Sequence, residues 1–97
     1  MHSFETPKSI EKKVMYSLKM IRKGKKLSQT DLAREMNVSR DTVARLESGR
    51  SRVTLAQVIT IAQILDATLD KILSEAENDE YLELPLDKTG NETQTTT

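Results

Sequence analysis

The segment LSQTDLAREMNVSRDTVARLESGR, residues 27–50, contains two helix starts and two helix ends within twenty-four residues. Ser28, with a carboxylate three positions later, forms a capping-box pattern, and Ser39 provides a second N-cap. Asn37 and Gly49 stand where each helix must stop, and both residue types tolerate the left-handed backbone that commonly ends a helix. The pattern predicts two short helices joined by a sharp turn.

The apolar residues of this segment fit two helices that cross closely. Ala33 is small enough for a close crossing, and Val38 is expected to fill the corner between the helices. Val43 and Leu46, three positions apart, would hold the second helix against the core. A short helix, a tight turn and a second helix make the geometry in which the second helix enters the major groove of DNA.

Three more helices are predicted around this pair. Thr6 and Pro7 start a helix that ends near Gly24, and Thr54 and Thr68 are N-caps of a fourth and a short fifth helix. The positions expected to face the core are Ile10, Val14, Leu18 and Ile21 in the first helix and Leu55, Val58, Ile61, Ala62 and Leu65 in the fourth, and the fifth helix carries Leu69, Ile72 and Leu73. The residues expected at the edge of the core are Met15, Tyr16 and Met20. The fold class is therefore all-α.

The composition changes after residue 74, so the sequence predicts a folded domain over residues 1–74 and a different segment over residues 75–97. The acidic run EAENDE begins this segment, and YLELPL at 81–86 alternates apolar and polar residues around a proline. We expect a short extended stretch there and a disordered tail over the last ten or so residues, which have nothing to bury.

The two halves of the chain carry opposite charge, although the whole chain has a formal net charge of zero. Residues 1–54 contain thirteen Lys or Arg against six Asp or Glu, a net +7, and residues 55–97 contain two against nine, a net −7. A basic half beside an acidic half indicates an anionic partner on one side, or else two solvated surfaces.

Several classes of function have no support in the sequence. There is no cysteine, and hence no disulfide framework or thiolate metal site. We find no phosphate-binding loop, no cluster of metal ligands and no nucleophile paired with a base, so we expect no enzyme activity, no cofactor and no metal. No apolar run reaches the length of a membrane span and the N-terminus lacks a signal peptide, which predicts a cytoplasmic protein.

The residues IRKGKKLSQTDLAREMNVSRDTVARLESGR, followed by TLAQVITIAQILDATLDKIL, resemble the Cro/CI-type, or XRE-type, helix-turn-helix regulators of bacteria and phages. The resemblance covers roughly Ile10 to Leu73 and implies a five-helix, lambda repressor-like DNA-binding domain. Asn37 and Asp66 stand at positions where the family often has glycine, but both residue types tolerate left-handed backbone.

The resemblance also implies a role for particular residues. The residues that would face base edges or adjoining phosphates are Ser39, Arg40, Asp41, Thr42, Ala44 and Arg45. The residues that would contact backbone phosphate are Gln29, Arg50, Ser51 and Arg52, and Gln29 would also buttress the recognition helix. Arg22 and Glu47 would form a partly buried ion pair. In chemical terms, an arginine can donate to both O6 and N7 of guanine, and Asp41 can accept from cytosine N4 or orient Arg45.

These observations predict a sequence-specific double-stranded DNA-binding regulator, a homodimeric repressor of a two-fold symmetric operator. Ile59, Ile64 and Ile72 are the candidates for the dimer interface. The alternative is an antitoxin of the HipB or HigA type, which represses its own operon and binds a toxin protein. Three roles stay open for the acidic segment with YLELPL: a cover for a basic toxin, a strand paired with the dimer mate, or a linker. A restriction–modification controller also fits the size, and an adaptor without DNA binding is the reading from another class.

Overall fold

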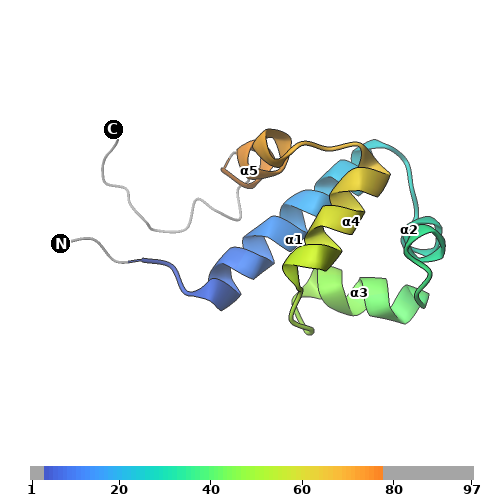
Figure 1. The fold of residues 1–97 in the computed structure, drawn as a ribbon, viewed down its shortest axis with the longest axis horizontal. Helices are drawn as coiled ribbons and strands as arrows, with labels where there is room; N and C mark the ends of the chain where they lie inside the picture. Colours follow the sequence, from blue (N-terminus) through green and yellow to red (C-terminus); the bar gives the residue numbers. More distant parts are fainter. Residues whose placement is uncertain (1–3, 78–97) are drawn as a thin grey trace.

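The structure, a computed structural model, describes residues 4–77, and within them the chain forms five α-helices and no strand (Figure 1). The helices are α1 (Pro7–Gly24), α2 (Gln29–Met36), α3 (Arg40–Ser48), α4 (Leu55–Leu65) and α5 (Leu69–Glu77). The predicted all-α, five-helix fold is confirmed. The extended stretch at 81–86 and the disordered tail were predicted for residues that lie outside the described ones.

Each helix begins at a side-chain cap that the sequence indicates. Thr6 Oγ1 accepts a hydrogen bond from the Ser9 N–H at 3.1 Å, and Pro7 occupies the first helical position. Reciprocal capping boxes start α2 and α4, because in each the N-cap hydroxyl and the side chain three residues later accept from one another's backbone N–H. These bonds are local in sequence, which explains why the starts are predictable.

Three helices end on a left-handed residue. Asn37, Gly49 and Asp66 follow α2, α3 and α4 with φ values of 61°, 82° and 55°. Helix α1 ends differently: Lys25 keeps a negative φ, and Lys26 is the residue that turns left-handed, with a φ of 62°. The tight turns that follow let consecutive helices pack at steep angles.

The core is aliphatic and draws on all five helices. Its buried apolar residues are Met15, Leu18, Ile21, Leu32, Ala33, Val43, Leu46, Ile61, Leu65, Ile72 and Ala76. The expected stripe on α1 is partly wrong, because Ile10 is 48% exposed and Met15 is only 2% exposed. The inward line of α1 also includes the polar residues Ser17 and Arg22, and a count of apolar spacing does not register these.

Helix α5 packs mainly on α1, although the two are far apart in sequence. The buried Ser17 Oγ donates to the Ile72 carbonyl oxygen at 2.6 Å, which ties the two helices together. α5 also runs past the domain boundary expected at residue 74, since it ends at Glu77 and buries Ala76. No helix among residues 4–77 is both long enough and apolar enough to span a bilayer.

The turn between α2 and α3 is closed by backbone rather than by a side-chain plug. The Val38 N–H donates to the Ala33 carbonyl at 3.0 Å, and Ala33 itself is buried. The Val38 side chain is exposed, so the expectation that it fills the corner is wrong. The left-handed Asn37 and this hydrogen bond together set the angle at which α3 leaves α2.

Candidate nucleic-acid interface

Helix α3 lies along one edge of the molecule, the lower edge in Figure 1, with α2 beside it and α5 at the opposite end. Its inward side carries Val43, Leu46 and Glu47, all buried. The six residues predicted to face DNA all lie outside that line: Ser39, Arg40, Asp41 and Arg45 are exposed, and Thr42 and Ala44 are half-buried. The structure therefore brings this group together on one solvent-facing side.

The polar residues of this face differ in the ion pairs and hydrogen bonds that they already form. Asp41 and Arg45 form an exposed ion pair of 3.2 Å across one helical turn, so Asp41 orients Arg45 in the unbound protein. The Ser39 hydroxyl accepts from the Thr42 N–H at 3.1 Å and shares a hydrogen bond with the Thr42 hydroxyl. Arg40 forms no ion pair with any residue from 4 to 77.

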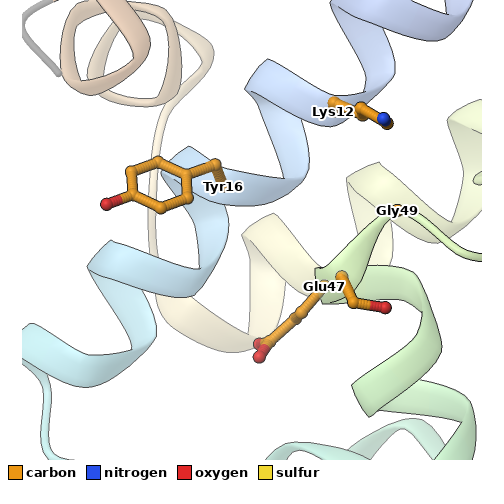
Figure 2. Close-up of a pocket in the computed structure, with 5 residues that line it drawn as sticks. Lys12, Tyr16, Glu47 and Gly49 are labelled. Carbon is orange, nitrogen blue, oxygen red and sulfur yellow. The ribbon is translucent and has the colours of Figure 1, made fainter. Parts of the chain in front are cut away.

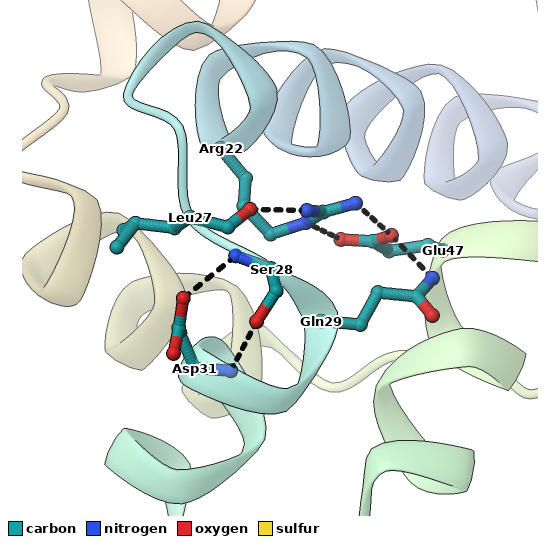
Figure 3. Close-up of polar contacts among 6 residues, drawn as sticks. All are labelled: Arg22, Leu27, Ser28, Gln29, Asp31 and Glu47. Atoms are coloured by element: carbon teal, nitrogen blue, oxygen red, sulfur yellow. Dashed lines mark hydrogen bonds and ion pairs between the residues drawn. The ribbon is translucent and has the colours of Figure 1, made fainter.

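A buried polar junction fixes α3 against α1 and α2 (Figure 3). Arg22 on α1 donates to both carboxylate oxygens of Glu47 on α3, from Nε at 2.7 Å and from the second terminal nitrogen at 3.0 Å. Its remaining terminal nitrogen donates to the Leu27 carbonyl at 2.5 Å, which closes the α1–α2 turn. The expected Arg22–Glu47 pair is thus present, and its side chains are only 6% and 3% exposed.

Gln29 completes this junction from the first turn of α2. Its side-chain N–H donates to Glu47 Oε1 at 3.0 Å, so the glutamine supports the third helix directly, as the resemblance implies. The bidentate arginine and this third donor leave little of the carboxylate unpaired, which is the condition under which a buried ion pair is tolerated. One network therefore positions the exposed face of α3 relative to two other helices.

The loop of residues 49–54 continues the same edge of the molecule (Figure 1). Gly49 has a φ of 82°, and a Cβ there would stand 3.2 Å from carbons of the Lys12 side chain. The N–H groups of Arg50 and Ser51 both donate to the Arg45 carbonyl, at 3.0 and 3.3 Å, and this closes the end of α3. The Arg50 Nε donates to the Ser48 hydroxyl at 3.1 Å, and the side chain is otherwise exposed.

Arg52 differs from the other residues expected to contact phosphate, because a carboxylate already holds it. Its Nε lies 3.0 and 3.1 Å from the two oxygens of Glu11 on α1, and a terminal nitrogen lies 2.6 Å from one of them. Glu11 also accepts from the Val53 N–H at 3.0 Å. The Arg52 guanidinium, followed by the Val53 N–H, lowers the pKa of Glu11 to about 2. The carboxylate raises the pKa of Arg52.

Sequence reasoning missed Glu11 entirely. The bonds to Arg52 join residues 41 apart, and nothing in the sequence of α1 distinguishes Glu11 from an ordinary helix glutamate. Only the placement of the loop against α1 creates the pair, and that placement depends on the whole fold.

A small pocket of about 190 Å³ lies between α1 and the end of α3, lined by Lys12, Tyr16, Glu47, Ser48 and Gly49. Figure 2 shows that the labelled side chains do not converge: the Tyr16 hydroxyl and the Glu47 carboxylate point to different sides. The Glu47 carboxylate is the one already bound by Arg22 and Gln29. The Glu47 carboxylate therefore helps to hold α3 in place and is not available to a ligand in the pocket.

A second surface, apolar in character, lies between α4 and α5. Leu55, Ile59 and Leu69 are exposed there, and residues of both helices line a groove of about 350 Å³. Of the three residues predicted for a dimer interface, Ile59 is 48% exposed, Ile64 is partly buried against the core and Ile72 is 1% exposed. The expectation for Ile72 is wrong, because α5 turns Ile72 and Ala76 toward the interior and Leu69 and Leu73 outward.

Part of the chain matches a family of known proteins. Residues 18–72 match the model of a family described as "Helix-turn-helix" (HTH_3), a range that includes all of α2, α3 and α4. Over 57 residues the chain is 33% identical to the HTH-type transcriptional activator BcrR of Enterococcus faecalis. This match spans 59% of the present chain but only 28% of BcrR.

A solved structure gives a second comparison. The fold is similar to the crystal structure of the clp gene regulator ClgR from Corynebacterium glutamicum, with a TM-score of 0.64 and 25% sequence identity. The superposition covers 69% of this chain and 71% of that one.

Proposed function

Because the chain belongs to the helix-turn-helix family of DNA-binding regulators, we propose that it is a sequence-specific regulator of transcription that represses as a homodimer on a two-fold symmetric operator. Helix α3 is the recognition helix of this proposal. The observation that carries the proposal is that the two sides of α3 differ. One side is anchored by Val43, Leu46 and Glu47, and the other presents Arg40 and Arg45 to solvent.

The proposed readers follow from the chemistry of this exposed side. Arg40 is free to donate to a guanine edge, and Arg45 is paired with Asp41 one helical turn away. Ser39, Thr42 and Ala44 lie beside them and complete the surface. Gln29, Arg50 and Ser51 would contact phosphates near the C-terminal end of α3, where Gln29 bonds to Glu47 and the loop begins.

The homodimer has support from the groove between α4 and α5. Three large apolar side chains exposed along this groove favour burial against an identical surface, and one module reads too few base pairs for a selective site. The regulator would act by binding DNA, without a catalytic step or a cofactor, in the cytoplasm where the chromosome lies.

Repression and the antitoxin alternative differ in their support. BcrR is named an activator, so a reporter gene behind the operator must distinguish repression, which we expect, from activation. The antitoxin alternative depended on residues 75–86, most of which lie outside the described residues, and neither the fold nor the comparisons support it.

The first prediction concerns Arg40 and Arg45. Operator fragments are selected from a genomic library with the wild-type protein, and each variant is then titrated against the operator, its single-base variants and a random duplex. Arg40→Ala or Arg45→Ala should weaken operator binding by about 1–3 kcal/mol per half-site and relax the preference at one base pair only.

Arg50→Ala is the matched control for this experiment. It removes the same charge from the adjoining loop and should weaken operator and random DNA alike, with a loss of about 0.9 in the log–log salt slope per half-site. If the two α3 variants behave like Arg50→Ala, α3 holds the backbone without reading sequence through these arginines. If the wild-type protein selects no fragment, the proposed function is wrong.

A further inference from the structure

Glu11 and Arg52 form a contact that the proposed DNA contacts do not account for. The arginine side chain is 69% exposed and stands in the loop after the recognition helix, at the edge of the molecule where α3 lies. An arginine in this position would be expected to bind phosphate. Its Nε and one terminal nitrogen are instead directed at the two oxygens of Glu11.

The chemistry of the two possible partners is the same. A carboxylate and a phosphate each offer two coplanar oxygens to the same fork of guanidinium donors, so one arginine fork cannot serve both at full strength. Glu11 is favoured because it already contacts Arg52 in the free protein, whereas a DNA phosphate would first have to displace it. The Val53 N–H supplies a further donor to the same carboxylate, which fixes its orientation.

The contact also determines how the loop is held. The loop is fixed at its start by the hydrogen bonds from Arg50 and Ser51 to the Arg45 carbonyl, and at its end by the capping box of Thr54. Between these points, Glu11 holds Arg52 and Val53 against α1. Without Glu11, the middle of the loop would depend on the partly buried Val53 side chain.

We propose that Glu11 occupies Arg52 in the place of a DNA phosphate, so that the pair holds the loop beside the recognition helix and contributes no charge to DNA binding. This inference rests on the proposed function, since it concerns the same surface. Non-specific binding is governed by the number of phosphates that free cations neutralise, and the pair removes one cation from that number in each protomer. The electrostatic part of the affinity, which specific and random DNA share, is lower by that one contact.

The test uses a charge-balanced pair of changes. Glu11→Gln leaves the Arg52 charge uncompensated, and Glu11→Gln with Arg52→Gln removes both charges while the net charge of the chain stays the same. On a random duplex, the single variant should steepen the log–log salt slope by about 0.9 per bound protomer. Between 50 and 200 mM salt this is an additional loss of affinity of about 3.5-fold. The double variant should have the wild-type slope.

Asp70→Asn is the matched control. It removes one exposed carboxylate from α5, at the end of the molecule opposite α3, and should leave the slope unchanged. A double variant whose slope is shallower than wild type by about 0.9 would show that Arg52 neutralises a phosphate, and this overturns the inference. An unchanged slope in Glu11→Gln, or an equal steepening in Asp70→Asn, overturns it as well.

A second measurement on the free protein separates this inference from the proposed function. A carboxyl-detected NMR titration should give Glu11 a pKa of about 2 in the wild type, and a higher pKa once Arg52 is Gln, with the Val53 N–H still bound. A wild-type pKa near 4.5 refutes the pairing whether or not the protein binds DNA. A pKa of about 2 together with no binding to any duplex refutes the proposed function and leaves the loop contact in place without a role in DNA binding, which also overturns the inference.

Discussion

Arg22 and Glu47 place two opposite charges inside an otherwise aliphatic core. Removing two charges from water is costly, and the cost is offset here because Arg22 also donates to the Leu27 carbonyl and Glu47 also accepts from Gln29. Such a junction is directional in a way that apolar contacts are not. It permits one relative orientation of α1, α2 and α3, and so it positions the exposed side of α3.

Arg22→Ala is expected to lower the free energy of unfolding by about 3–5 kcal/mol, because it leaves the Glu47 charge buried with only Gln29 to satisfy it. Urea unfolding at neutral pH measures this loss. The control is Arg34→Ala, which breaks an exposed pair with Asp31 and should cost no more than about 1 kcal/mol. Equal effects of the two changes would mean that the Arg22 pair is not buried in solution.

At the residue scale, sequence reasoning found the contacts that follow a recurring pattern and missed those that depend on the assembled fold. The Arg22–Glu47 pair was implied by resemblance to a known family. The bond from Ser17 to the Ile72 carbonyl and the pair of Glu11 with Arg52 join residues 55 and 41 apart. Neither has a local signal, because serine and glutamate on a helix are ordinarily solvent-facing.

The backbone conformation of a single residue can determine where a helix ends. Gly49 ends α3 with a φ of 82°, and the Lys12 side chain lies over it. Gly24 is the last residue of α1, with nothing near the position of a Cβ and no positive φ. The two glycines therefore have different roles, although both stand at a helix end.

Gly49→Ala should destabilise the fold by about 1–2 kcal/mol, since an L-residue is strained in the left-handed region. Gly24→Ala should be neutral or should stabilise the fold by about 0.4–1 kcal/mol, because alanine restricts the unfolded chain and strains nothing in α1. Thermal unfolding of the two variants beside wild type measures both effects. A destabilised Gly24→Ala, or an unaffected Gly49→Ala, would contradict this account of the helix ends.

At the element scale, helix starts and ends were predicted well and helix faces less well. Caps depend on residues within four positions of one another, so the sequence contains them whole. Faces depend on which neighbour a helix meets. Ile10 was expected on the inward face of α1 and is half-exposed, whereas Met15 is buried, and Ile72, expected at a dimer interface, is buried in the core. The polar residues Ser17 and Arg22 shift the inward line of α1 away from the purely apolar one.

The molecule as a whole has two surfaces with different character. The edge formed by α3 and the loop after it is polar and charged, and the groove between α4 and α5 is apolar. Because the two surfaces belong to different elements, a partner on one leaves the other accessible. This separation is what a dimer that also binds DNA requires.

Ile59→Lys should convert the proposed dimer to a monomer, because it places a charge on the apolar surface of α4. Ile10→Lys is the matched control: Ile10 is also 48% exposed but lies on the first turn of α1, and this change should leave the dimer intact. Sedimentation at tens of micromolar, about the range in which modest interfaces form, distinguishes the two. A wild-type monomer, or equal disruption by both changes, would place the interface elsewhere.

The packing of α5 on α1 has a consequence for the order in which the protein is completed during synthesis. α1 leaves the ribosome before the other described helices, but until α5 has been made the Ser17 hydroxyl lacks its Ile72 acceptor and the surface of α1 that contacts α5 is uncovered. A nascent chain that ends at α4 must therefore keep a buried surface of α1 open to solvent. α3 is translated before α5, yet α1, which anchors α3, is enclosed only when α5, the last described helix, has been made.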